Sequence, residues 1–334
     1  MENKKVVFNV IMPCYNSEKY VITALDSIVN QTYPHWHLTA INDGSTDKTL
    51  EFLEKYAEKD KRITVLSKEN GGYVSAVNYG LDHLNGDYFL FLGSDDYLST
   101  ELFFEIEKKL SLMVELPDCI AFKTAVCYGD YIKTDFFTKF DTLAFKENTT
   151  IKEYSEENPA HSDIFFVKDT SKCFKCDLLK DLRYFGKFGI DADGIFSMLF
   201  CNNAKSFLSV PFHGYYWTIR EGSVSSSSTK SIEKEFDKLD NWQKFFNELE
   251  KMDISDISPK EIEYLAFAHG QLCELILDFG VVCKYSKIIK KHIRWVISKE
   301  KRFSFEGSRN FQFKMFLISP VLSSIFYKLY KRIK

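Results

Sequence analysis

The sequence predicts an α/β fold, with a mainly parallel central sheet flanked by helices and a basic helical region at the C-terminal end. In residues 1–100, short apolar runs alternate with segments whose apolar residues recur every three or four positions. Strands separated by helices of this length are joined by right-handed crossovers, which make neighbouring strands parallel. A third observation concerns charge: residues 284–334 hold 14 Lys and Arg against two Glu, within a region of helical pattern.

The elements of the first hundred residues follow from these runs. The first helix is expected to begin at a cap on Ser17, and the second at a cap on Ser45 or Thr46. Side chains of this kind satisfy the first backbone N–H groups of a helix. A third helix is expected over residues 74–84. Strands are expected at residues 6–12, 38–41, 63–66 and 88–92.

Beyond residue 100 the pattern is less regular. Serines crowd residues 223–228, which is typical of a domain junction. We therefore expect one domain over 1–228, with halves 1–100 and 101–228, and a helical region over 229–334 that is basic from about 284. Within the second half we expect a helix over 100–116, short strands over 118–170, a helix from 185–194 to about 202 and an aromatic strand over 210–219.

The composition is that of a globular protein, with 334 residues of which 45% are apolar and 27% charged. No run of eighteen apolar residues predicts a membrane span, and the first residues lack the long apolar stretch of a signal peptide. A cytoplasmic location is therefore expected, with the eight Cys as reduced thiols. Cys173 and Cys176 have the spacing of a metal or redox pair, but no second pair completes such a site.

Each predicted strand of the first half ends in a polar cluster. The clusters include three carboxylates, Asp43, Asp95 and Asp96, and turns in which glycine lets the backbone approach a ligand. In a parallel sheet, ligands bind beyond the carboxyl ends of the strands. The sequence therefore predicts a ligand site at one edge of the sheet, formed by residues 13–16, 42–45, 68–72 and 93–96.

Four motifs at these strand ends resemble those of one enzyme family. They are I-M-P-C-Y-N at 11–16, D-G-S-T-D at 43–47, N-G-G at 70–72 with A-V-N-Y-G at 76–80, and F-L-G-S-D-D-Y at 91–97. In order and spacing they resemble the family-two glycosyltransferases of the GT-A fold, the type that builds bacterial capsule, exopolysaccharide or O-antigen. The resemblance implies an inverting transfer of a sugar from a UDP-sugar to a hydroxyl group of a glycan acceptor.

The resemblance also implies roles for individual residues. Asp43 would accept a hydrogen bond from the uracil ring, and Asp95 and Asp96 would hold Mn²⁺ or Mg²⁺, which prefer oxygen ligands. His213 is either a further metal ligand or a packed residue of its strand. Arg220 and Ser223 either clamp the diphosphate or form an ordinary turn. The other residues implied to contact the nucleotide sugar are Pro13, Tyr15, Asn16, Asn70, Gly71, Asn78 and Ser94.

The general base is expected at the start of the helix that follows residue 190. Asp191 aligns with the base of the family, with Asp193 as second choice. Asp191 also suits a helix cap, and the two roles are compatible. A carboxylate here would remove the proton of the acceptor hydroxyl as that hydroxyl attacks the anomeric carbon.

Three positions depart from the family pattern. Gly93 stands where many relatives have the first Asp of the metal motif, Val77 where they often have Arg, and Ile190 where they have Glu. A catalytically degenerate sugar-nucleotide-binding or scaffold protein is therefore an alternative. A nucleotidyltransferase is a second alternative, although no glycine-rich loop with Lys or Arg follows the first strand.

The basic tail leaves several partners open. Its Lys and Arg interleave with aromatic and aliphatic residues over 303–330, which suits the surface of an anionic membrane. Such a placement, peripheral to the inner face of the cell membrane, fits the polyprenyl-diphosphate-linked acceptor that many relatives use. The tail could instead pack on the catalytic domain or on a second copy of the chain in a homo-oligomer. Nucleic acid is not an expected partner, because the preceding 283 residues carry 45 acidic against 30 basic residues.

Overall fold

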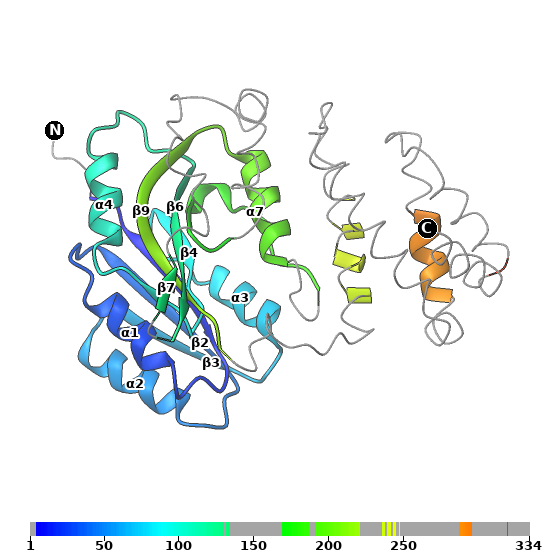
Figure 1. Ribbon diagram of the computed structural model, residues 1–334, viewed down its shortest axis with the longest axis horizontal. Coiled ribbons are helices and arrows are strands. Elements are labelled where there is room, and N and C mark those ends of the chain that lie inside the picture. Colours follow the sequence, from blue (N-terminus) through cyan, green and yellow to red (C-terminus); the bar gives the residue numbers. More distant parts are fainter. Residues whose placement is uncertain are drawn as a thin grey trace. The chain divides into compact units, whose positions relative to one another are not determined.

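The chain divides into two compact units, Met1–Thr229 and Lys230–Lys334, and the predicted domain boundary lies between residues 228 and 229. The computed structural model describes residues 5–129, 131–133, 169–186 and 192–220, and in the second unit parts of 236–247, 287–295 and 319 (Figure 1).

Seven elements form the first half of the first unit: β1 (Phe8–Cys14), α1 (Val21–Val29), β2 (Trp36–Asp43), α2 (Thr49–Lys59), β3 (Ile63–Lys68), α3 (Tyr73–Leu81) and β4 (Tyr88–Phe91). β1 pairs in parallel with β2 and with β4, and β2 pairs in parallel with β3. The order of these strands in the sheet is β3-β2-β1-β4. The predicted alternation of strands and helices is confirmed here.

The rest of the unit adds β5 (Tyr97–Leu98), α4 (Leu102–Leu110), β6 (Cys119–Tyr128), β7 (Tyr131–Lys133), β8 (Lys172–Lys175), a 3₁₀ turn (Cys176–Leu178), α7 (Ala192–Asn203) and β9 (Phe207–Thr218). β8 lies antiparallel between β4 and β6, and β9 pairs in parallel with β6 and antiparallel with β5. The whole sheet is therefore mixed, and its parallel character belongs mainly to the first half.

Helices cover both faces of the sheet. Phe8 of β1 stacks on Phe103 of α4, with 4.7 Å between ring centroids. On the other face, a Cβ added to Gly80 of α3 would lie 2.6 Å from Cγ2 of Ile11, so α3 packs directly on β1. Residues 8 and 11 point to opposite faces because side chains alternate along a strand. Figure 1 shows α1 and α2 on the α4 side and α7 on the α3 side.

Both predicted helix caps are wrong. α1 begins at Val21, and the Ser17 hydroxyl forms a hydrogen bond with the Ser94 hydroxyl at 2.6 Å instead of capping it. α2 begins only at Thr49, whose backbone N–H donates to Asp47 at 2.9 Å. Ser and Thr side chains form hydrogen bonds in loops as well as at helix ends, and here they bond to loop residues.

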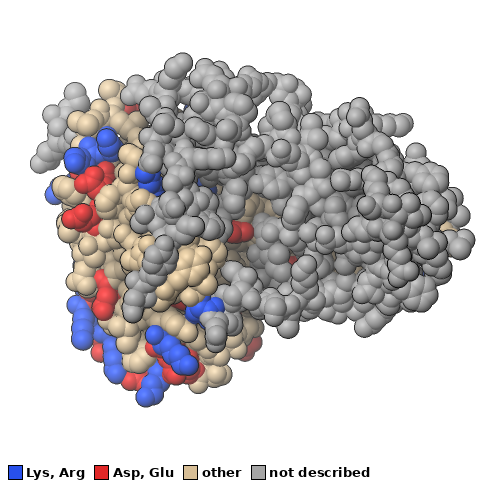
Figure 2. Space-filling view, in the orientation of Figure 1, with Lys and Arg blue, Asp and Glu red and all other residues tan. Residues whose placement is uncertain are grey.

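Charged side chains of the first unit are mixed in sign on the face seen in Figure 2. On α2, for example, Lys55 pairs with Glu51 at 2.6 Å. In the second unit, Ile289 and Ile293 are buried on the helix that spans 287–295, and Lys291 pairs with Asp240 at 3.1 Å. The predicted membrane face over 303–330 lies outside the described residues except for position 319. Within the described part of the chain, no helix has the length and apolar character needed to cross a membrane.

Candidate functional site

The loops after β1 and β2 are tied to each other by their own polar side chains. Asn16, with a positive φ of 49°, accepts the backbone N–H of Thr46 at 2.9 Å, and its own N–H donates to the Ser45 hydroxyl at 3.1 Å. The N–H of Glu18 donates to Asp47 at 3.0 Å. The second Asp of the D-G-S-T-D motif therefore holds loops together, and so does Asn16, which the family resemblance placed beside the base.

Pro13 and Tyr15 flank this pair of loops at the end of β1. Pro13 is the last but one residue of the strand and is paired with Ile41 of β2. Tyr15 is 52% exposed, so its ring is open to a ligand at the edge of the sheet. An exposed aromatic ring beside polar loops suits stacking on a nucleobase.

Asp43 is almost fully buried at the end of β2, and its carboxylate organises the glycine loop that precedes α3. Oδ1 accepts the Lys68 ammonium at 2.8 Å and the Gly71 N–H at 3.0 Å, and Oδ2 accepts the Gly72 N–H at 2.8 Å. A carboxylate offers about four lone-pair sites, so one more donor can be accommodated. The structure thus brings Asp43 and Gly71 together as predicted, with Asn70 beside them: a Cβ added to Gly44 would lie 2.8 Å from the Asn70 nitrogen.

Asp96 is a buried anchor between the acidic turn and β9. Its Oδ2 accepts the Tyr215 hydroxyl at 2.6 Å and its Oδ1 accepts the Thr218 N–H at 2.8 Å. The same Tyr215 hydroxyl accepts the N–H of Gly93 at 3.1 Å, which closes the turn. Both oxygens of Asp96 therefore hold the turn to β9, which makes Asp95 the better placed of the two for a metal ion; the metal role of Asp96 stays a prediction. Ser94, in the same turn, is bonded to Ser17.

Asp95 faces the other way and pairs with Arg220, two residues after β9. The Arg220 Nε donates to Asp95 Oδ2 at 2.6 Å, and the guanidinium lies over the Tyr20 ring, 4.7 Å from its centroid. The side chain of Asp95 is 23% exposed and that of Arg220 is 31% exposed. Arg220 therefore reaches the acidic turn, its role as a diphosphate clamp stays a prediction, and Ser223 lies outside the described residues.

Gly93 is explained by close packing of the two carboxylates. A Cβ at this position would lie 2.7 Å from Asp96 Oδ2 and 3.0 Å from Asp95 Oδ1. Any side chain, including the Asp of many relatives, would force the carboxylates outward. The close packing of this turn therefore explains the departure from the family pattern at Gly93. Val77, the second departure, is fully buried on α3 and faces the core.

His213 is not brought to the acidic turn. β9 runs antiparallel to β5, and Asp96 binds Thr218 at its far end, five residues beyond His213. At about 3.3 Å per residue that is on the order of 15 Å. Among the described residues, no group of three or more His, Cys, Asp or Glu is arranged to hold a metal. A cation site here would therefore rest on Asp95.

α7 carries the expected base region. Asp191 lies outside the described residues, and Asp193 is in the first turn of α7. Desolvation of its hydroxyl, followed by the negative charges of Asp169 and Asp193 and then of the acidic turn, raises the pKa of Tyr73, although 43% of this residue is exposed. The carboxylates from three separate segments thus act on one point at the start of α3. Neither Tyr73 nor Asp169 stands in a motif of the family.

The side-chain amide of Asn78 is bonded within the protein. Its side-chain amide forms a reciprocal pair with the backbone of Tyr184: Nδ2 donates to the carbonyl at 3.1 Å and Oδ1 accepts the N–H at 2.8 Å. The Tyr184 ring stacks on Phe196 of α7 at 4.7 Å and meets Phe91 of β4 at 5.3 Å. Asn78 therefore fixes the segment that leads into α7 against the strand that leads into the acidic turn.

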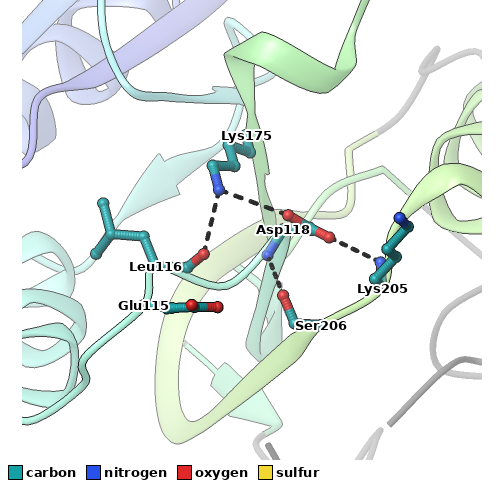
Figure 3. A pocket seen from close by; sticks show the side chains of 6 residues that line it. All are labelled: Glu115, Leu116, Asp118, Lys175, Lys205 and Ser206. Carbon is teal, nitrogen blue, oxygen red and sulfur yellow. Dashed lines mark hydrogen bonds and ion pairs between the residues drawn. The ribbon is translucent and has the colours of Figure 1, made fainter. Parts of the chain in front are cut away.

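A separate hollow of about 430 Å³ lies at the opposite edge of the sheet, lined by Glu115, Leu116, Asp118, Lys175, Lys205 and Ser206 (Figure 3). Asp118 pairs with Lys175 at 3.6 Å and accepts the backbone N–H of Lys205 at 2.7 Å, so its charge is used within the protein. Lys175 is opposite Tyr88, the first residue of β4, far from the strand ends that carry the motifs.

The cysteines give no sign of redox or metal chemistry in the described chain. None of the six described cysteines forms a disulfide bond. Burial raises the pKa of Cys176 to about 12 and that of Cys173 further still, so neither thiol of the C-x-x-C pair is a thiolate at neutral pH.

Comparison with known proteins places this site in a family. Residues 9–182, more than half of the chain, match the family described as Glycosyl transferase family 2. The chain belongs to glycosyl transferase family 2. All four motif-bearing strand ends lie within the matched residues, so the resemblance drawn from them is confirmed.

Individual relatives of this family cover different shares of their own length. Glycosyltransferase GlyA of Streptococcus pneumoniae is 29% identical over 65% of this chain but only 31% of GlyA, so the chain spans about a third of that relative. An uncharacterized glycosyltransferase of Haemophilus influenzae is 31% identical over 67% of this chain and 83% of its own length. The crystal structure of Staphylococcus aureus TarS 1–349 with UDP-GlcNAc superposes with a TM-score of 0.72 at 22% identity, covering 97% of this chain and 92% of that one. The chain therefore has the GT-A glycosyltransferase fold.

Proposed function

We propose that the protein is a glycosyltransferase that moves a sugar from a UDP-sugar to a hydroxyl group of a glycan acceptor in the synthesis of a cell-surface polysaccharide. The observation that carries the proposal is the meeting, at one edge of a family-two domain, of buried Asp43 with its glycine loop and of the turn that presents Asp95. The fold relative TarS is a poly(ribitol-phosphate) β-N-acetylglucosaminyltransferase and was crystallised with UDP-GlcNAc, which supports a UDP-sugar and a polymeric acceptor.

The nucleotide would lie across the ends of β1 and β2. Asp43 keeps capacity for one more donor, which suits the ring N–H of uracil, and the exposed ring of Tyr15 suits stacking on the base. Asn70 and Gly71 belong to the loop that Asp43 holds, so the wall of the base pocket would be rigid before the nucleotide arrives.

Asp95 would hold the divalent cation, Mn²⁺ or Mg²⁺, while Asp96 fixes the turn beneath it. Such ions commonly use one or two carboxylates together with substrate phosphates and water, so a single protein carboxylate is a sufficient anchor. When bound, the cation acts as a Lewis acid toward the charge that develops on the departing diphosphate. Arg220, already at this turn, would supply a positive charge for the same phosphates.

Asp191 is proposed as the general base, with Asp193 as second choice. Its carboxylate would take the proton of the acceptor hydroxyl while the hydroxyl oxygen forms a bond to the anomeric carbon. The bond between that carbon and the phosphate oxygen breaks on the opposite side, and UDP leaves with the electron pair. A single displacement of this kind inverts the anomeric configuration.

Release of nucleoside diphosphate from a panel of nucleotide sugars tests this function. With Mn²⁺ or Mg²⁺ present, we expect UDP release from at least one UDP-sugar, loss of release in EDTA and recovery when metal is added back. Turnover that persists in EDTA would contradict the cation at Asp95. Binding of UDP-sugar without turnover would favour a degenerate sugar-nucleotide binder, and release of pyrophosphate would favour a nucleotidyltransferase.

The basic tail is proposed to hold the enzyme at the inner face of the cell membrane, near a polyprenyl-diphosphate-linked acceptor. Each Lys or Arg close to an anionic surface contributes roughly 1 kcal/mol of binding, so the excess of basic residues over 284–334 suits such a surface. The full chain is expected to sediment with anionic liposomes at low salt, and a chain lacking 284–334 is expected to stay in the supernatant. If both stay in the supernatant, the tail is instead a packing or homo-oligomer contact.

A further inference from the structure

We propose that Arg220 occupies Asp95 while the donor site is empty and leaves it for the diphosphate when nucleotide and cation arrive together. Arg220 is then a positioning residue that makes cation binding depend on the nucleotide. The inference rests on the proposed function, since it takes Asp95 as the protein's anchor for the cation.

The acidic turn gives a cation few places to bind. Both oxygens of Asp96 accept hydrogen bonds, from Tyr215 at 2.6 Å and from Thr218 at 2.8 Å. Asp95 Oδ2 accepts a hydrogen bond from the Arg220 Nε at 2.6 Å. A divalent ion that binds Asp95 without nucleotide must therefore share one carboxylate with a guanidinium.

Sharing of that kind is unfavourable because both partners are cations. Two positive groups on one carboxylate repel each other, and the repulsion is screened less at a half-buried site than in free solution. A diphosphate reverses the balance, because its oxygens bind a metal ion and a guanidinium side by side. Movement of Arg220 away from Asp95 is therefore favourable only when the phosphates are present.

The surroundings of Arg220 suit a side chain with two positions. Arg220 lies two residues beyond the end of β9, and its side chain is 31% exposed, so it is not locked in the core. The Tyr20 ring lies under the guanidinium at 4.7 Å and supports it through its face, which attracts a cation without fixing its direction.

Linkage gives the consequence that can be measured. If Arg220 must leave Asp95 before a cation binds, UDP and Mn²⁺ raise each other's affinity by the same factor, which for coupled sites is typically about 5- to 150-fold. Removing the guanidinium has opposite effects on the affinity for Mn²⁺ alone and on the affinity for UDP with Mn²⁺. Mn²⁺ alone binds more tightly, because its competitor is gone, and UDP in the presence of Mn²⁺ binds more weakly, because a phosphate contact is gone.

Titration of the full chain with Mn²⁺, followed by the loss of the free Mn²⁺ resonance in electron paramagnetic spectra, tests the proposal without any turnover. Arg220→Gln is expected to bind Mn²⁺ without nucleotide about fivefold or more tightly than the natural chain, and UDP with Mn²⁺ more weakly. Arg62→Gln is the matched control, because Arg62 also pairs with an aspartate, Asp60 at 2.6 Å, and lies over an aromatic ring, that of Trp36 at 3.7 Å. It should leave both affinities unchanged.

Two results overturn the proposal, and only one of them also contradicts the proposed function. If Arg220→Gln and the natural chain bind Mn²⁺ equally without nucleotide, Arg220 does not compete for Asp95, and the proposed function stands. If neither binds Mn²⁺ even with UDP, the cation part of the proposed function fails as well. Should the Gln variant not fold, Arg220→Lys replaces it: a shorter reach to Asp95 is expected to give a smaller gain in Mn²⁺ affinity, and no gain contradicts the exchange.

Discussion

Replacing Asp191 by Asn is expected to lower the rate of sugar transfer by about a hundred- to ten-thousand-fold, because a positioned general base contributes that much to a reaction of this kind. Asn has the same shape and can still accept a hydrogen bond at a helix start, but it cannot take the proton of the acceptor hydroxyl. UDP affinity, measured by calorimetry with Mn²⁺, should stay within a few fold, since the base acts on the acceptor and not on the nucleotide.

Asp193→Asn is the comparison that makes the result specific. Asp193 is in the first turn of α7, close enough for its charge to act on Tyr73. If transfer survives in Asp191→Asn and is lost in Asp193→Asn, the base is Asp193 and the alignment of the family motif was two residues out. Near-normal transfer in both variants would exclude a base at the start of this helix.

The first half of the fold could be predicted because its signals are local. β1 and β4 are continuous apolar runs, and the helices between strands show one apolar face, so their existence followed from spacing alone. The cap predictions failed because the hydroxyl groups of Ser17 and Ser45 bond to Ser94 and Asn16, which are 77 and 29 residues away in the sequence. The position of β8 between β4 and β6 could not be predicted from the sequence either, because this pairing depends on contacts between residues far apart in the chain.

The candidate site shows the same division. Topology carries the polar clusters of parallel strands to one edge, so the meeting of Asp43 with Gly71 was predictable from the strand order. The partners that come from later segments could not be predicted. The Tyr215 hydroxyl donates a hydrogen bond to Asp96, and the Tyr184 backbone N–H donates one to Asn78. Each of these pairs spans more than a hundred residues, and each changes the role that the family motif implies.

The same substitution at the two neighbouring aspartates of the acidic turn should lower different quantities: the rate of transfer for Asp95 and the stability of the fold for Asp96. Asp95→Asn is expected to lower metal-dependent transfer by at least about a hundredfold, because Lewis-acid stabilisation is worth several kcal/mol and each 1.4 kcal/mol is tenfold in rate. Its effect on the free energy of unfolding should be small, about 0–1 kcal/mol, since the ion pair that it removes from Arg220 is partly exposed.

Asp96→Asn should instead act on stability. An amide at this buried position keeps one acceptor but turns N–H groups toward the Tyr215 hydroxyl or the Thr218 N–H, which leaves buried donors without acceptors. Such a loss costs about 1–3 kcal/mol, measurable as a lower midpoint of urea denaturation at unchanged slope. If Asp96→Asn folds as stably as the natural chain and yet fails to bind Mn²⁺ with UDP, Asp96 is a metal ligand after all. Asp95 would then be the residue that only positions the turn, and the exchange proposed for Arg220 would lose its basis.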